Sequence, residues 1–247
     1  MKISEKKSFG LLGTRIDNFS SVEIMKKIHF FLSDNHFHQI ATINPEFVLE
    51  AQKNSTFKKI LNQCDLNVAD GWGIKLAFAR FGKKLRTRIP GTDLMRKVLN
   101  EAEKKDLSVF LATRKDGLSH WRETQNALLK IYPKLEIAGD DIDPKNVKYR
   151  LPNTKCQVLL CNFGAPDQEI FINSQKNATI RLAMGVGGSF DFLTGKAKRA
   201  PKFLRQIGME WFWRMFQPQK WSFKKERIKR IFKSVMIFPI KIIFNLI

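Results

Sequence analysis

The chain has 247 residues, of which 43% are hydrophobic, and this suits an α/β domain with a sizeable core. The N-terminus has no apolar segment of signal-peptide length, and no stretch has the roughly 18 uncharged apolar residues of a membrane span, so we expect a cytoplasmic protein. The formal net charge is +21, and residues 196–247 carry +12 of it, which predicts an anionic partner for the C-terminal part.

Strand and helix patterns alternate along the first four fifths of the chain. Ser20 and Glu23 have the spacing of a capping box at the start of the first helix. In chain order, the periodicity predicts helix 21–34, strand 39–43, helix 45–63, strand 66–69, helix 74–81, helix 93–105, strand 107–113, helix 118–131, strand 135–139, strand 158–164, helix 166–175 and strand 180–186. Because the strand runs are apolar throughout, we expect a Rossmann-like parallel sheet with helices on both faces.

From Ala200 onward the pattern is helical only. Apolar side chains recur at helical spacing at Ile228, Ile231, Phe232, Val235 and Met236, with cations toward the other side. We expect Pro239 to interrupt this helix. The chain is therefore divided into a core, residues 1–195, and a basic helical appendage, residues 196–247.

Polar or glycine-rich loops follow four of the predicted strands. Ligands of open α/β sheets bind outside the carboxyl ends of the strands, so these loops are candidates for one site. Asp70 ends one strand and is either a cap for the next helix or a catalytic base. The glycines at 187 and 188 suit anion binding by backbone N–H groups, but Phe190 replaces the third glycine of a dinucleotide fingerprint.

Seven motifs then occur in the order of a known family. They are Thr42-x-Asn44, Asp70-Gly71-x-Gly73, the run from Arg88 to Asp93, Gly164-x-Pro166-x-Gln168-Glu169, the run from Gly185 to Asp191, Arg199-Ala200-Pro201 and Glu210-Trp211. Over roughly residues 10–218 the chain resembles the WecG/TagA/CpsF glycosyltransferases. The resemblance implies inverting, metal-independent transfer of an N-acetylmannosamine-type sugar or related hexose. The donor would be a UDP-sugar and the acceptor a polyprenyl-diphosphate-linked glycan in bacterial cell-surface polysaccharide synthesis.

The resemblance also implies roles for individual residues. Asp70 would be the general base, with Thr42 and Asn44 holding the donor beside it. Arg88 and Gln168 would contact the sugar or the diphosphate. Further substrate-binding positions are Gly71, Gly91, Gly164, Glu169, Gly187, Gly188 and Asp191. The alternative for Arg88 is a solvated loop cation, and the alternative for Asp191 is a helix or turn cap. Residues 112–115 replace a glycine pair that is usual in the family.

The basic tail predicts a peripheral protein on the cytoplasmic face of the bacterial inner membrane. A helix with cations on one side and apolar residues on the other suits an anionic membrane surface. The residues expected to meet membrane or acceptor are Arg214, Lys220, Arg227 and Arg230. The sequence leaves open that the tail instead packs on its own domain or on a neighbouring subunit of a homo-oligomer.

Two other functions are weaker on sequence. Asp141 and Asp143 have the spacing of a metal–diphosphate clamp, but they are expected in a turn before Pro144, so no metal and no cofactor is predicted. None of the four histidines has a partner at convincing ligand spacing. A basic nucleic-acid-binding protein without transferase activity is the alternative function. It is disfavoured because the tail aromatics follow core spacing, and we expect no nucleic-acid partner.

Overall fold

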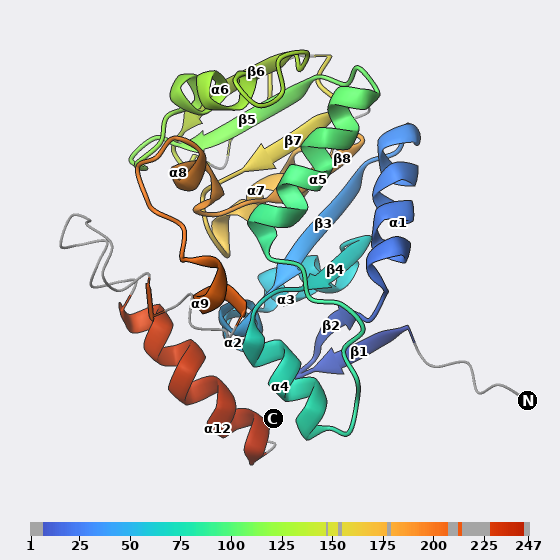
Figure 1. The fold of residues 1–247 in the computed structure, drawn as a ribbon, viewed down its shortest axis with the longest axis vertical. Helices are drawn as coiled ribbons and strands as arrows, with labels where there is room; N and C mark the ends of the chain where they lie inside the picture. The colour runs from blue at the N-terminus through green and yellow to red at the C-terminus, as the bar shows by residue number, and fades with distance from the viewer. Residues whose placement is uncertain are drawn as a thin grey trace, which may run out of the picture.

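A single sheet of eight strands forms the centre of the computed structural model, which describes residues 7–146, 148–152, 155–176, 179–206, 212–213 and 228–244 (Figure 1). The strands lie in the order β1-β2-β4-β3-β8-β7-β5-β6, and only the β1–β2 pair is antiparallel. Their bounds are β1 Ser8–Leu11, β2 Thr14–Asp17, β3 His38–Ile43, β4 Leu66–Ala69, β5 Val109–Arg114, β6 Ile137–Ile142, β7 Val158–Cys161 and β8 Leu182–Gly185. The predicted parallel α/β sheet is confirmed.

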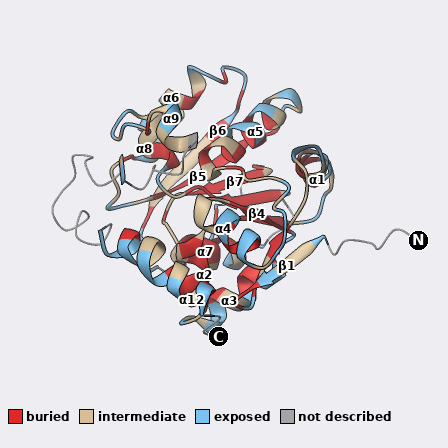
Figure 2. Cartoon of the chain, turned by 60° about the horizontal axis from the view of Figure 1, so that its bottom comes forward, coloured by how far each residue is buried: buried red, intermediate tan, exposed pale blue. Residues whose placement is uncertain are grey.

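Helices cover both faces of this sheet. One face carries α1 (Ser21–Ser33), α5 (Gly91–Lys104), α6 (Trp121–Leu129) and α8 (Ser189–Leu193). The other carries α2 (Pro45–Ala51), α3 (Ser55–Gln63), α4 (Trp72–Arg80) and α7 (Asp167–Ser174). Within β5, Val109 packs toward the first set and Phe110 toward the second. Burial on both sides explains why the central strands read as unbroken apolar runs (Figure 2).

Two predicted elements need correction. Residues 45–63 form two helices and not one, because a new helix, α3, begins at Ser55. Asn54 caps it, since Asn54 Oδ1 accepts a hydrogen bond from Phe57 N at 3.0 Å. The strand expected at residues 135–139 is Ile137–Ile142, so Asp141 lies in β6 and not in a turn. Its neighbour β5 pairs with it along the full length, from Val109 opposite Ile137 to Arg114 opposite Ile142.

An N-terminal hairpin was not predicted. Strands β1 and β2 have four residues each, too few to give a clear periodicity. They are joined at Leu12 and Gly13, both with positive φ, as in a type I′ two-residue hairpin. Strand β2 then joins the sheet beside β4, with Asp17 opposite Val68.

The C-terminal helix, residues 228–243, continues through Pro239. It contains a π-helical turn, η1 (Lys233–Ile237), followed by α12 (Phe238–Ile243), with the proline in the first turn of α12. The chain stays helical across Pro239, so the expected interruption is wrong. The π turn, in which the Phe238 N–H donates to the Lys233 carbonyl, ends directly before the proline, which itself has no N–H to donate. Phe238 and Ile242 are buried in one cluster with α2 and α4. Among the described residues, no helix is long and apolar enough to span a membrane.

One further short helix, α9 (Lys202–Gln206), lies between the sheet and this C-terminal helix in the chain. Part of the proposed appendage lies outside the described residues, including Arg214, Lys220 and Arg227. The division of the chain at residue 195 therefore stays a prediction.

Candidate active site

The predicted donor and base residues converge where β3 and β4 end. The Asp70 N–H donates to the carbonyl of Ile43 at 2.7 Å, and Asp70 Oδ2 accepts from Gly91 N at 3.2 Å. A Cβ added at Gly91 would lie 3.2 Å from Thr42 Oγ1 and 3.8 Å from Asp70 Oδ2. The hydroxyl of Thr42 and the carboxylate of Asp70 therefore both face the first turn of α5.

Asp70 does not cap the helix that follows it. The N-cap of α4 is Gly71, and no side chain makes a cap hydrogen bond there. Gly71 has φ +85°, a conformation that glycine adopts without strain and that turns the chain away after Asp70. The cap interpretation is wrong, and the carboxylate instead lies at the N-terminus of α5, where the helix dipole favours negative charge.

Part of the Asn44 side chain stabilises the start of a helix. It is the N-cap of α2, and its Oδ1 accepts from Phe47 N at 3.1 Å. Its side chain also borders Gly71, because a Cβ added at Gly71 would lie 3.9 Å from Asn44 Cβ. The Asn44 amide group thus stands beside the turn that carries Asp70, and its contact with a donor stays a prediction.

Arg88 lies in a loop that is pinned to the end of β4. Ile89 N donates to the carbonyl of Ala69 at 3.0 Å, and the Arg88 guanidinium carbon lies 5.8 Å from the centre of the Trp72 ring. Arg88 is only partly exposed. An aromatic ring near the guanidinium attracts the cation without neutralising its charge, which suits a cation that meets an anionic ligand.

Gln168 and Glu169 lie under the loops that follow β7 and β8. Gln168 Oε1 accepts from Gly164 N and from Gly187 N, both at 3.1 Å, and Gln168 Nε2 donates to Glu169 Oε1 at 2.7 Å. The two residues are 3% and 1% exposed. Burial raises the pKa of Glu169 to about 8, only partly opposed by the Gln168 hydrogen bond. Their direct contact with a substrate stays a prediction.

Gly188 and Asp191 lie at the start of α8, which contacts α5 through Ser189 and Thr92. Gly188 is exposed and is the N-cap of α8, and a Cβ added there would lie 3.7 Å from Asp191 Oδ2. Asp191 Oδ1 accepts from Ser119 Oγ at 2.8 Å. The described contacts of Asp191 thus include a link to the segment before α6, and its role in a nucleotide pocket stays a prediction.

Two contacts that sequence reasoning did not assign tie α5 to the surrounding loops. The hydroxyls of Thr92 and Ser189 lie 2.8 Å apart, and Arg199 Nη1 donates to Asp93 Oδ1 at 2.7 Å. Burial opposes ionisation of Asp93, but Arg199 more than offsets it, so the pKa of Asp93 is lowered. The sequence did contain a signal for the Asp93–Arg199 pair, since both residues belong to motifs of the family.

The acidic residues near Pro144 serve the scaffold. Asp141 accepts from Thr113 Oγ1 and from Trp121 N, the latter at 3.0 Å. Asp143 Oδ1 accepts from Lys145 N at 2.9 Å. The described residues contain no group of three or more His, Cys, Asp or Glu side chains that is arranged to hold a metal. Metal independence itself stays a prediction.

Arg114 is the last residue of β5. Its N–H donates to Asn162 Oδ1 at 2.7 Å, and its Nη1 donates to the Phe163 carbonyl at 3.2 Å. Arg114 therefore braces the loop after β7.

Of the predicted membrane residues, the structure describes Arg230, whose Nη1 lies 4.0 Å from Glu46 Oε2 on α2.

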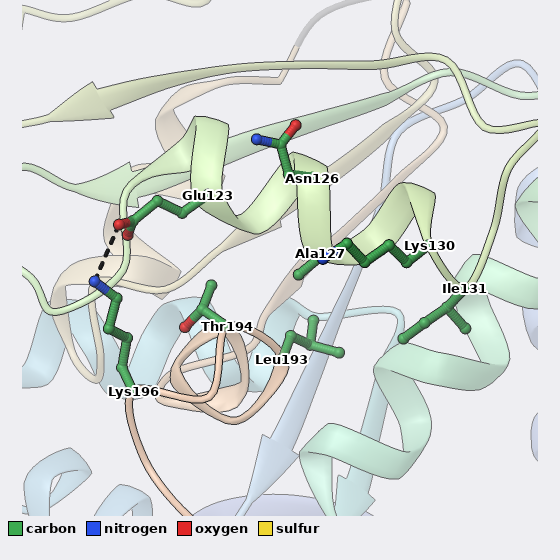
Figure 3. A pocket seen from close by; sticks show the side chains of 8 residues that line it. All are labelled: Glu123, Asn126, Ala127, Lys130, Ile131, Leu193, Thr194 and Lys196. Atoms are coloured by element: carbon green, nitrogen blue, oxygen red, sulfur yellow. Dashed lines mark hydrogen bonds and ion pairs between the residues drawn. The ribbon is translucent and has the colours of Figure 1, made fainter.

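A surface pocket of about 380 Å³ lies between α6 and the end of α8 (Figure 3). Its lining residues are Glu123, Asn126, Ala127, Lys130, Ile131, Leu193, Thr194 and Lys196. Glu123 and Lys196 pair across it at 3.0 Å. Because this pocket does not include Thr42, Asp70 or Gly91, we place the chemistry at the strand ends and not here.

Comparison with known proteins gives one consistent result. Residues 9–244 match the model of the "Glycosyl transferase WecG/TagA/CpsF family". A protein of Staphylococcus aureus (strain MRSA252), named N-acetylglucosaminyldiphosphoundecaprenol N-acetyl-beta-D-mannosaminyltransferase, is 32% identical over 241 residues, covering 94% of this chain and 91% of that protein. A protein of the same name from Bacillus spizizenii (strain W23) is 31% identical over 198 residues, covering 77% and 76%.

Proposed function

The chain belongs to the WecG/TagA/CpsF family and is a glycosyltransferase, and we propose that it moves an N-acetylmannosamine-type sugar from a UDP-sugar to a polyprenyl-diphosphate-linked acceptor. The names of both relatives state an N-acetylglucosaminyldiphosphoundecaprenol acceptor and the transfer of an N-acetyl-β-D-mannosaminyl group. The UDP donor rests on the family resemblance of the sequence motifs. The reaction would extend a lipid-linked glycan for the bacterial cell surface.

The single observation that carries this proposal is the carboxylate of Asp70 beside Thr42 at the start of α5. In the proposed step, Asp70 accepts the proton of the acceptor hydroxyl while that oxygen bonds to the anomeric carbon. The bond from this carbon to the UDP oxygen breaks, and its electron pair leaves with UDP. One displacement inverts the anomeric centre, and a positioned base of this kind contributes about 10²–10⁴-fold to the rate.

The negative charge that develops on UDP needs stabilisation. We assign this to Arg88, whose guanidinium lies near the Trp72 ring, together with the backbone N–H of Gly188 at the start of α8, since the Gly187 N–H donates to Gln168. Cationic side chains and amides then take the part that a divalent metal plays in other transferases. Excess EDTA is accordingly expected to leave the transfer rate unchanged, and an EDTA-sensitive rate restored by Mg²⁺ or Mn²⁺ would contradict this assignment.

The decisive experiment is a reconstituted transfer. The full chain is incubated with UDP-N-acetylmannosamine and an N-acetylglucosaminyl-diphosphate-lipid, and the lipid product is analysed by mass spectrometry and NMR. We expect a product heavier by one N-acetylhexosamine and linked with inversion. A panel of other UDP-sugars identifies the donor, and a wild-type protein that transfers none of them would refute the proposal.

The C-terminal helix supports contact with the membrane that holds the acceptor. Its outer side chains recur every four residues and are 42–67% exposed, at Ile228, Phe232, Met236, Ile240 and Phe244. We call these five residues the outer stripe. Lys229, Arg230, Lys233 and Lys241 flank it. Because the inner residue Phe238 lies against Gly73, three positions after Asp70, docking of the stripe on lipid would bring the proposed base close to the acceptor.

A further inference from the structure

Gln168 joins the ends of two neighbouring strands through a single oxygen atom. Its Oε1 accepts one hydrogen bond from Gly164, which follows β7, and one from Gly187, which follows β8, both at 3.1 Å. Both glycines have positive φ, at 82° and 49°, conformations that other residues rarely adopt. The Gln168 carboxamide is 3% exposed, and it acts as a latch between the two loops.

The latch works in only one orientation of the carboxamide. A rotation that exchanges oxygen and nitrogen would turn the Gln168 NH₂ group toward two N–H donors and break both bonds. Glu169 opposes this rotation, because its Oε1 accepts from Gln168 Nε2 at 2.7 Å. Gly185, the last residue of β8, makes room for the pair, since a Cβ there would lie only 2.6 Å from Glu169 Oε1.

We propose that Glu169 is a positioning residue, which holds Gln168 so that the loops after β7 and β8 keep the geometry that receives the sugar-nucleotide donor. The inference rests on the proposed function, because it takes these loops as part of the donor site. Glu169 itself is 1% exposed, and its other oxygen, Oε2, is buried without a hydrogen-bond partner. In this proposal Glu169 acts through Gln168, in place of the direct substrate contact that the family resemblance implies.

The test compares Glu169→Met and Gln168→Met with the double variant. Each single change removes the oriented acceptor, so we expect KM for the UDP-sugar to rise about tenfold or more, with a smaller change in kcat. The double variant is expected to be no worse than Gln168→Met alone, because residues that act as one unit are not additive. Glu169→Gln keeps an acceptor at the Oε1 position and is expected to restore most of the lost affinity.

Gln175→Met is the matched control. Gln175 is also buried at the C-terminal end of α7, and its Oε1 accepts from Leu151 N at 2.9 Å, away from both glycine loops. This variant suffers a comparable loss of buried hydrogen bonds and is expected to leave KM unchanged. Equal KM values for Glu169→Met and Gln175→Met, or additive effects in the double variant, would overturn the inference.

Amide hydrogen exchange supplies a readout that does not depend on activity. In the ligand-free protein, Gly164 and Gly187 are expected to exchange at least tenfold faster in Glu169→Met than in the wild type or in Gln175→Met. Unchanged exchange at both glycines would refute the latch. A wild-type protein that transfers no sugar would refute the proposed function, while the exchange rates would still decide the latch.

Discussion

Asp70 differs from the other carboxylates near the site in what surrounds it. Asp93 is paired with Arg199 at 2.7 Å, and Glu169 is buried under the glycine loops. Asp70 is partly exposed and accepts from the first amide of α5. Of these three groups, it is the one that lies at a strand end with its carboxylate turned to the first turn of α5, where we propose that the acceptor hydroxyl approaches.

Asp70→Asn tests this assignment with the least change in shape. The asparagine oxygen still accepts from Gly91 N but takes up no proton, so kcat is expected to fall by about 10²–10⁴-fold. Binding of UDP, measured by calorimetry, is expected to stay within about twofold, because the nucleotide contacts are assigned elsewhere. A variant with wild-type kcat would remove Asp70 as the base.

Glu169 predicts a pH dependence of stability. Its pKa rises from the ordinary 4.5 to about 8 on folding, because burial disfavours the charged form. Between these values the folded chain binds the proton and the unfolded chain does not, so stability is fully present below about pH 4.5 and is lost as pH rises toward 8. The loss is on the order of a few kcal/mol at about 1.4 kcal/mol per pKa unit.

Urea unfolding between pH 5 and pH 8 measures this dependence. Glu169→Gln removes the titrating group, and we expect its free energy of unfolding to vary less with pH than that of the wild type. The two proteins should differ in slope even where they are equally active. Parallel curves over this range would show that Glu169 is already ionised in the folded protein.

At the scale of elements, α2 and α3 begin in the same way but stand in different places. Asn44 caps α2 at 3.1 Å and Asn54 caps α3 at 3.0 Å. Only Asn44 adjoins the Asp70 turn, at Gly71. Comparing Asn44 with Asn54 therefore separates the effect of a helix cap on stability from the effect of a contact with the donor.

Asn54→Ala and Asn44→Ala are each expected to cost about 1 kcal/mol of stability, the usual effect of losing an N-cap. Only Asn44→Ala is expected to raise KM for the UDP-sugar, by about tenfold if its amide also binds the donor. Thermal unfolding and steady-state kinetics on both variants measure the two effects. Equal KM values would leave Asn44 with the cap role alone.

At the scale of the whole molecule, the C-terminal helix has two apolar sides. Phe238 and Ile242 are 1% and 3% exposed against α2 and α4, whereas the outer stripe faces away from the core (Figure 2). The helix thus has residues for both roles that the sequence left open for a monomer, which are packing on its own domain and contact with a membrane. One side packs on the domain, and the other is free for the proposed lipid contact.

Replacing Phe232 and Met236 together by Gln tests the membrane proposal without disturbing the inner side. We expect co-sedimentation with phosphatidylglycerol vesicles to fall at least tenfold, since each side chain loses apolar area that would enter the interface. The matched control makes the same replacement at two exposed apolar residues of α1, Val22 and Phe30, which are 64% and 58% exposed. Equal vesicle binding by both double variants would contradict a specific role of the stripe.

The sequence by itself determined the elements that depend on neighbours along the chain. The capping box of Ser20 and Glu23 forms as predicted, and the apolar runs around Val109 and Val158 are central strands. It also determined the family, because seven motifs retain their order. It failed at the β1–β2 hairpin and at the break before Asn54, where short elements leave little periodicity, and at Pro239, where a π turn before the proline keeps the chain helical.

Only the tertiary structure decided which motif residues meet and how. The strand order places Asp70 against Gly91 and sends Gln168 beneath two loops, and neither contact has a signature in local spacing. Periodicity reports whether a side chain faces the core, because each turn or pleat repeats that choice. A hydrogen bond between distant segments depends on how the whole sheet is assembled, so its partners become known only when the fold is complete.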